Sequence, residues 1–103
     1  MAMMMVILEA HISPDKWGQF EGAYKASVQA LDPGIVETRL IHSAIDPTYW
    51  RILTVWRNRE ALEKVRERSS TLPGVLLFRE AGTEPRLAVY QVVAQATEAR
   101  LAA

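Results

Sequence analysis

Two segments in the middle of the chain alternate polar and apolar residues with a period of two. The first covers residues 35–44 and the second residues 49–56, and Asp46-Pro47-Thr48 lies between them. Such alternation predicts strands with one face toward a core, and Asp-Pro-Thr is typical of a turn. The pair therefore predicts an antiparallel hairpin, and hence a sheet that the other segments extend or cover.

A strand and a helix are expected before this hairpin. Residues 6–12 are mostly apolar or β-branched and predict a strand. Ser13-Pro14-Asp15 is typical of a helix start, because serine caps well and proline fits the first helical position. An apolar stripe with spacings of three and four follows: Trp17, Phe20, Tyr24, Val28 and Leu31. Asp32-Pro33-Gly34 is expected to end this helix.

One helix and two strands are expected after the hairpin. Asn58 is expected to cap a helix over residues 59–69, whose charges alternate in sign and predict a solvated face that includes Arg68. Pro73-Gly74 is expected to break that helix. Strands are expected over residues 75–79 and 87–94.

The resulting order β-α-β-β-α-β-β predicts an α+β fold. Two helices on one face of an antiparallel sheet make the ferredoxin-like arrangement, here with an added strand. At 103 residues the chain is long enough for one domain only. We expect a single domain over residues 1–103, with its core at about 6–94 and a tail at 95–103, frayed or helical from residue 97 onward.

Both faces of several expected strands are apolar, so the face without helices needs a cover. Residues 75–79 show this, and so do residues 49–56, with Trp50 and Ile52 on one face and Leu53 and Val55 on the other. A second copy packed face to face covers such a sheet symmetrically. The pattern predicts a homodimer through the sheet faces.

Composition narrows the classes of partner. Lys plus Arg equals Asp plus Glu at 12 each, which predicts no nucleic-acid or anionic-membrane partner. The chain has no cysteine, which excludes thiolate metal sites and cysteine nucleophiles. It shows neither a basic leader nor a run of roughly 18 apolar residues, and we expect a cytoplasmic protein.

Three passages resemble one known family. They are Pro33-Gly34-Ile35 at the second strand, LIHSAIDP over residues 40–47, and WRNREAL over residues 56–62. In this order, across about residues 6–94, they resemble the antibiotic biosynthesis monooxygenase family of the dimeric α/β-barrel superfamily. The resemblance implies a dimeric α/β barrel. It also implies an enzyme that oxygenates small aromatic molecules, such as anthrones or hydroquinones, with O2 and without metal or flavin.

The chain departs from this pattern at one place. Quinol-oxidising and haem-degrading relatives carry a histidine after the second helix, where this chain reads Arg68-Ser69-Ser70-Thr71-Leu72-Pro73. This argues against haem ligation, and we expect no cofactor and no metal. Two alternatives stay open: a non-catalytic homodimer that binds a small hydrophobic ligand, and an isomerase of the same superfamily.

The candidate catalytic residues are one tryptophan and two histidines. Trp56 matches the tryptophan that lies near the pocket in the family, although it also suits an anchor between helix and sheet. His42 and His11 are candidate proton acceptors, because the ordinary pKa of histidine lies near neutrality.

The candidate substrate-binding residues are two aromatics and two arginines. Tyr24 and Phe78 are expected to wall a pocket between the sheet and the helices. Arg51 and Arg79 lie on expected strands, where they either form cross-strand ion pairs or bind an acidic or phenolate oxygen.

Overall fold

Within residues 2–69 and 71–96, which the computed structural model describes, four strands form one antiparallel sheet with the order β2-β3-β1-β4. The strands are β1 (Met4–His11), β2 (Ile35–His42), β3 (Tyr49–Trp56) and β4 (Arg86–Gln91). The expected hairpin is confirmed as β2 and β3, with Leu40 opposite Ile52. The tail expected over residues 97–103 lies outside the described residues.

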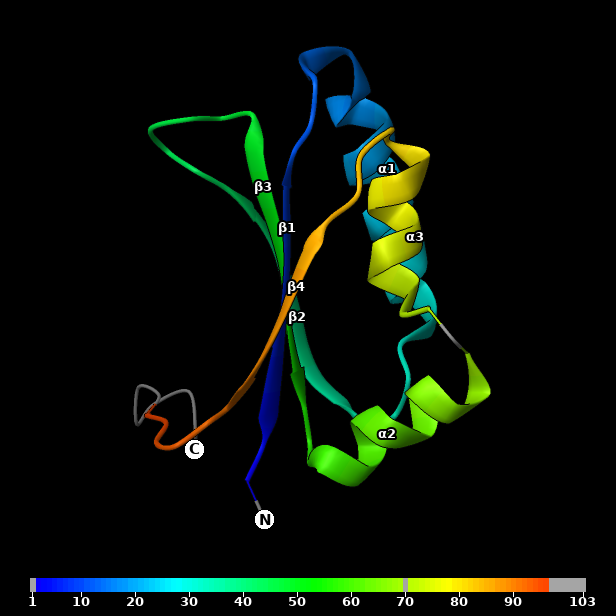
Figure 1. Ribbon diagram of the computed structural model, residues 1–103, viewed down its shortest axis with the longest axis vertical. Coiled ribbons are helices and arrows are strands. Elements are labelled where there is room, and N and C mark those ends of the chain that lie inside the picture. The colour runs from blue at the N-terminus through cyan, green and yellow to red at the C-terminus, as the bar shows by residue number, and fades with distance from the viewer. Residues whose placement is uncertain (1, 70, 97–103) are drawn as a thin grey trace.

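The helices all lie on one side of this sheet (Figure 1). They are α1 (Trp17–Ser27), α2 (Arg59–Arg68) and α3 (Pro73–Glu80), with the short 3-10 turns η1 (Pro14–Lys16) and η2 (Val28–Ala30) on either side of α1. The Asn58 side chain caps α2 by accepting a hydrogen bond from the Ala61 N–H at 2.8 Å. The expected ferredoxin-like α+β class is confirmed.

Strand β1 lies between two neighbours and carries much of the core. Its alternate residues face the helices and are buried: Met4, Val6, Leu8 and Ala10. The register places Leu8 opposite Ile52 of β3 and opposite Leu87 of β4. Apolar side chains of three neighbouring strands therefore form one surface against which the helices pack.

An aromatic cluster holds α1 and α3 against the sheet. The rings of Phe20 and Phe78 lie 4.8 Å apart, and Phe20 meets Trp50 of β3 edge-on at 5.7 Å. Phe20 and Phe78 are 1% and 0% exposed. The Trp17 indole N–H also donates to the Ile12 carbonyl at 2.8 Å, which fixes the start of α1.

The prediction of a strand over residues 75–79 is wrong, because this segment belongs to helix α3. Val75 and Phe78, three residues apart, are buried, whereas Leu76 between them is 48% exposed. A short apolar run fits a buried strand and a buried helix equally well, and here the three-residue spacing decides. Pro73 begins this helix, since proline suits its first turn. The element order is therefore βαββααβ, and the sheet gains no fifth strand from this segment.

We predict that replacing Phe78 with alanine lowers the free energy of unfolding by about 3–5 kcal/mol, because a fully buried ring would leave a cavity. Urea unfolding followed by circular dichroism measures this change. The matched control is Leu76→Ala on the same helix, which should cost under about 1 kcal/mol. Equal losses in the two variants would contradict the helical assignment of this segment.

Candidate functional site

A cavity of about 400 Å³ lies between the sheet and the helices, toward the Trp56 end of β3 and away from the aromatic cluster at Trp50. Its walls come from β1, β2, β3, the end of α1, the η2 turn and the facing ends of α2 and α3. Most of the lining is aliphatic, including Val6, Leu8, Val28, Leu31, Ile52, Leu72 and Leu77. Its volume is within the roughly 300–1,000 Å³ range of small-molecule sites.

Gly74 allows α3 to begin directly on the sheet beside this cavity. A Cβ atom at this position would lie 2.7 Å from Leu8 Cδ1, so any side chain here would displace that of Leu8. Glycine therefore permits the first turn of α3 to rest on β1. Leu72 and Leu77, which flank this turn, line the cavity in consequence.

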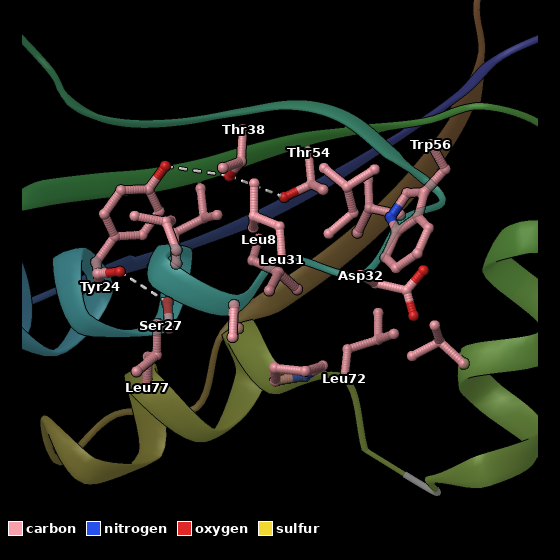
Figure 2. Close-up of a pocket in the computed structure, with 18 of the residues that line it drawn as sticks. Leu8, Tyr24, Ser27, Leu31, Asp32, Thr38, Thr54, Trp56, Leu72 and Leu77 are labelled. Carbon is pink, nitrogen blue, oxygen red and sulfur yellow. Dashed lines mark hydrogen bonds between the residues drawn. The ribbon is translucent and has the colours of Figure 1, made fainter.

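Three hydroxyl groups form a chain along one wall of the cavity. The Tyr24 hydroxyl of α1 donates to Thr38 Oγ1 of β2 at 3.1 Å, and Thr38 Oγ1 lies 3.3 Å from Thr54 Oγ1 of β3 (Figure 2). The two threonines are cross-strand partners in the register of β2 and β3. Each hydroxyl can donate and accept, so the chain can bind a ligand oxygen in either role.

Trp56 places an indole at the other end of this polar wall. The residue is 4% exposed, and Figure 2 shows its nitrogen on the side of the ring that faces the cavity. No hydrogen bond joins its N–H to another residue that the structure describes, and the fully buried indole N–H without a partner is that of Trp50. A donor in this position can bind an acceptor atom of a ligand.

An ion pair stands at the mouth of the cavity. Arg68, the last residue of α2, donates through Nη2 to Asp32 Oδ2 at 2.6 Å, and Gly34 N–H donates to Asp32 Oδ1 at 2.8 Å. Both side chains also line an adjacent surface hollow, which places the pair at the boundary with solvent. The Gly34 N–H and the Arg68 guanidinium lower the pKa of Asp32. Asp32 is therefore a poor proton acceptor.

His42 lies outside this cavity, in a neighbouring groove between α1 and β2. The groove has a volume of about 590 Å³, and Tyr24 and Thr38 line both it and the cavity. The His42 ring lies 5.0 Å from the Trp50 ring, and its Nδ1 lies 3.2 Å from the Ser43 carbonyl oxygen. The Tyr24–Thr38 hydrogen bond thus separates His42 from the cavity.

His11 and Arg51 lie on the face of the sheet opposite the helices. His11 Nδ1 lies 3.0 Å from Thr48 Oγ1, and Arg51 Nε donates to Glu9 Oε2 at 2.6 Å. Hydrogen bonds from Tyr49 and Arg51 lower the pKa of Glu9. They outweigh the partial burial of the carboxylate, which by itself raises the pKa. Glu9 and Arg51 are also partners in the register of β1 and β3. Arg51 therefore forms a cross-strand ion pair, which was one of the two roles expected for it from the sequence.

The remaining candidates are also outside the cavity. Arg79 forms a bidentate ion pair with Glu84, in which Nε donates to Oε1 at 2.8 Å and Nη2 donates to Oε2 at 3.1 Å. Phe78 belongs to the aromatic cluster. Of the residues selected from the sequence, the cavity brings together Trp56 and Tyr24. Sequence reasoning missed Thr38, Thr54 and the Asp32–Arg68 pair. Two threonines on strand positions that face the helices were the available signal for the first two.

The residues in the described part of the chain contain no group of three or more His, Asp or Glu side chains placed to hold a metal ion. None of the helices over residues 2–69 and 71–96 is both long and apolar enough to cross a membrane.

The chain matches one known protein family over most of its length. The family described as antibiotic biosynthesis monooxygenase matches residues 3–79, which include β1 to β3, α1, α2 and nearly all of α3. The chain belongs to the antibiotic biosynthesis monooxygenase family. No curated protein matches it.

Several solved structures share the fold of this chain. A candidate antibiotic biosynthesis monooxygenase from Bordetella bronchiseptica aligns with a TM-score of 0.70 and 16% identity, over 91% of this chain and 100% of that one. A candidate from Nitrosomonas europaea gives 0.64 and 20%, over 88% and 90%. A conserved protein from Methanosarcina mazei Go1 gives 0.68 and 14%, over 87% and 92%. At these identities the likeness shows the fold alone.

We predict that Asp32→Asn weakens the acid dependence of stability. Because the folded-state pKa of Asp32 is below its ordinary value of 3.8, the carboxylate stabilises the fold above that pH and loses this effect as pH falls through the folded-state pKa. Urea unfolding between about pH 6 and pH 2 should show the wild-type advantage over Asp32→Asn shrinking toward acid. A difference that is constant with pH would refute the role of the charge.

Proposed function

We propose that this protein oxygenates a small, electron-rich aromatic molecule of the anthrone or hydroquinone type, with O2 and without an added cofactor. The observation that carries the proposal is a mostly apolar cavity with a chain of hydroxyl groups along one wall and an ion pair at its mouth. Membership of the antibiotic biosynthesis monooxygenase family supports this type of reaction.

The reaction needs no electrons from outside the substrate. Loss of a proton from the phenol or enol gives an anion, and this anion passes an electron to O2. One oxygen atom then forms a bond to carbon, and the other leaves as water with the two hydrogens that the substrate loses. The tasks left to the protein are to exclude water, to accept a proton and to stabilise the anion.

The polar wall supplies the groups that would stabilise this anion. The free N–H of Trp56 and the hydroxyl of Thr54 are donors on the cavity side, and Thr38 and Tyr24 extend the chain behind Thr54. Such donors are stronger in a dry site than in water. We assign them to the substrate oxygen from which the proton leaves.

We assign the proton acceptor to His42 rather than His11. The hydroxyl chain leads from Thr54 to Tyr24, and Tyr24 lines the groove in which His42 lies. A proton can pass from Thr54 through Thr38 to Tyr24 once the hydroxyls turn so that Thr38 donates to Tyr24 and Tyr24 donates toward the groove, because each hydroxyl both donates and accepts. His11 lies on the opposite face of the sheet, away from this groove.

One observation favours a second candidate function, non-catalytic binding of the same class of molecule. The described lining of the cavity includes no histidine, and its carboxylate, Asp32, has a lowered pKa. An isomerase would use the same cavity without O2. Turnover separates both enzymes from the binding protein, and dependence on O2 separates the oxygenase from the isomerase.

We predict protein-dependent oxygen uptake when the purified protein, freed of metal, meets a panel of anthrones and hydroquinones. Trp56→Phe and Thr54→Val should each lower the rate at least about tenfold, because each removes a donor to the developing anion. His42→Ala should lower it as well. The control is Thr83→Val, in the turn after α3 and outside the cavity lining, which should retain the rate. Equal rates in all variants would remove the polar wall from the mechanism.

We also propose that the chain forms a homodimer through the sheet face opposite the helices. Register places apolar residues of three strands together on this face: Met5, Ile7, Leu53, Val55, Ala88 and Tyr90. Tyr90 is 55% exposed, and Ile41 of β2 on the same face is 40% exposed. A symmetric partner would remove this surface from water.

We predict a mass twice the 11.6 kDa of the chain in light scattering at micromolar concentration. Leu53→Lys should shift the mass to that of one chain, since it places a charge in the middle of the outer face. Leu76→Lys, on an exposed position of α3, should leave the dimer intact. A wild-type mass of one chain would refute the proposed dimer.

A further inference from the structure

The charged side chains of the cavity are gathered at one end. Arg68 and Asp32 are its charged residues among those described, and both stand at the mouth. The rest of the lining is aliphatic, aromatic or hydroxyl-bearing. A molecule that fills the cavity therefore meets an apolar interior and one ionic end.

Asp32 and Arg68 differ in how much hydrogen-bonding capacity they have left. Both carboxylate oxygens of Asp32 are engaged, one by the Gly34 N–H and one by Arg68. The guanidinium has five N–H donors, and one of its nitrogens engages Asp32. The mouth of the cavity therefore offers further donors that suit an acceptor, above all a carboxylate.

Arg68 is also free to turn toward a ligand. Its side chain is 68% exposed, whereas that of Asp32 is 23% exposed, and it extends from the last residue of α2. An exposed ion pair contributes little to stability, so part of its geometry can change at small cost. The guanidinium can then bind Asp32 and a second anion together.

We propose that Arg68 binds an acidic group on the occupant of the cavity, so that the substrate class is an aromatic molecule that carries a carboxylate. This inference rests on the proposed function, because it assigns one end of the same site. The acid lies at the mouth beside Arg68, and the oxygen-bearing ring lies inside, against Thr54 and Trp56. Arg68 is then a specificity-determining residue, whereas Arg51 and Arg79 are engaged with carboxylates elsewhere.

Two fluorescent dyes with one skeleton test this assignment. Anilinonaphthalene sulfonate carries an anionic group, and phenylnaphthylamine is its uncharged parent. Arg68→Gln should weaken binding of the sulfonate about three- to fivefold and leave that of the uncharged dye unchanged. Asp32→Asn should tighten binding of the sulfonate, because it removes the competing carboxylate and keeps an acceptor for the Gly34 N–H.

Two further variants separate the possible outcomes. Arg66→Gln makes the same change in net charge on α2 outside the cavity lining, and Thr54→Phe fills the cavity. If Arg68→Gln and Arg66→Gln affect the sulfonate equally, the role of Arg68 is wrong, while uncharged-dye binding that Thr54→Phe abolishes leaves the proposed function standing. If neither dye binds in a way that Thr54→Phe abolishes, the cavity is not a binding site, and both proposals fail.

Discussion

The packing of Phe20 against Phe78 is the contact on which the rest of the structure depends. It joins α1 to α3, and Phe20 also packs edge-on against Trp50, near one end of β3. Aromatic rings pack together at this end, and both phenylalanines are essentially unexposed. Toward the Trp56 end the lining is mostly aliphatic, and α2 lies there in place of the α1–α3 pair (Figure 1). The cavity is thus a consequence of where the large side chains are placed.

Much of the fold could be predicted from period and turn chemistry. The hairpin, β1, α1 and α2 follow from alternation, from spacings of three and four, and from the Asn58 cap. Helix α3 could not, because residues 75–78 are all apolar and only burial distinguishes Leu76 from its neighbours. Pro73-Gly74 was ambiguous as well, since the same pair ends one helix or begins the next. Here proline begins α3, and glycine allows it to touch Leu8.

Less of the candidate site could be predicted. Tyr24 stood out because it is the polar-tipped member of an apolar stripe, and Trp56 because of the family resemblance. The Thr38–Thr54 contact depends on strand register, which alternation alone leaves open by one residue pair or more. Arg68 was hidden among alternating charges on α2, and its partner Asp32 is 36 residues away in sequence. Long-range pairing of this kind has no local signal.

The wall between the cavity and the His42 groove is one side chain thick. Tyr24 belongs to both linings, and a single hydrogen bond to Thr38 ties its hydroxyl to the sheet. Such a bond contributes only about 1 kcal/mol net, so it holds the phenol weakly. Partly exposed side chains change rotamer within nanoseconds. The cavity and the His42 groove are therefore kept apart by the rotamer of one ring and not by the position of a helix.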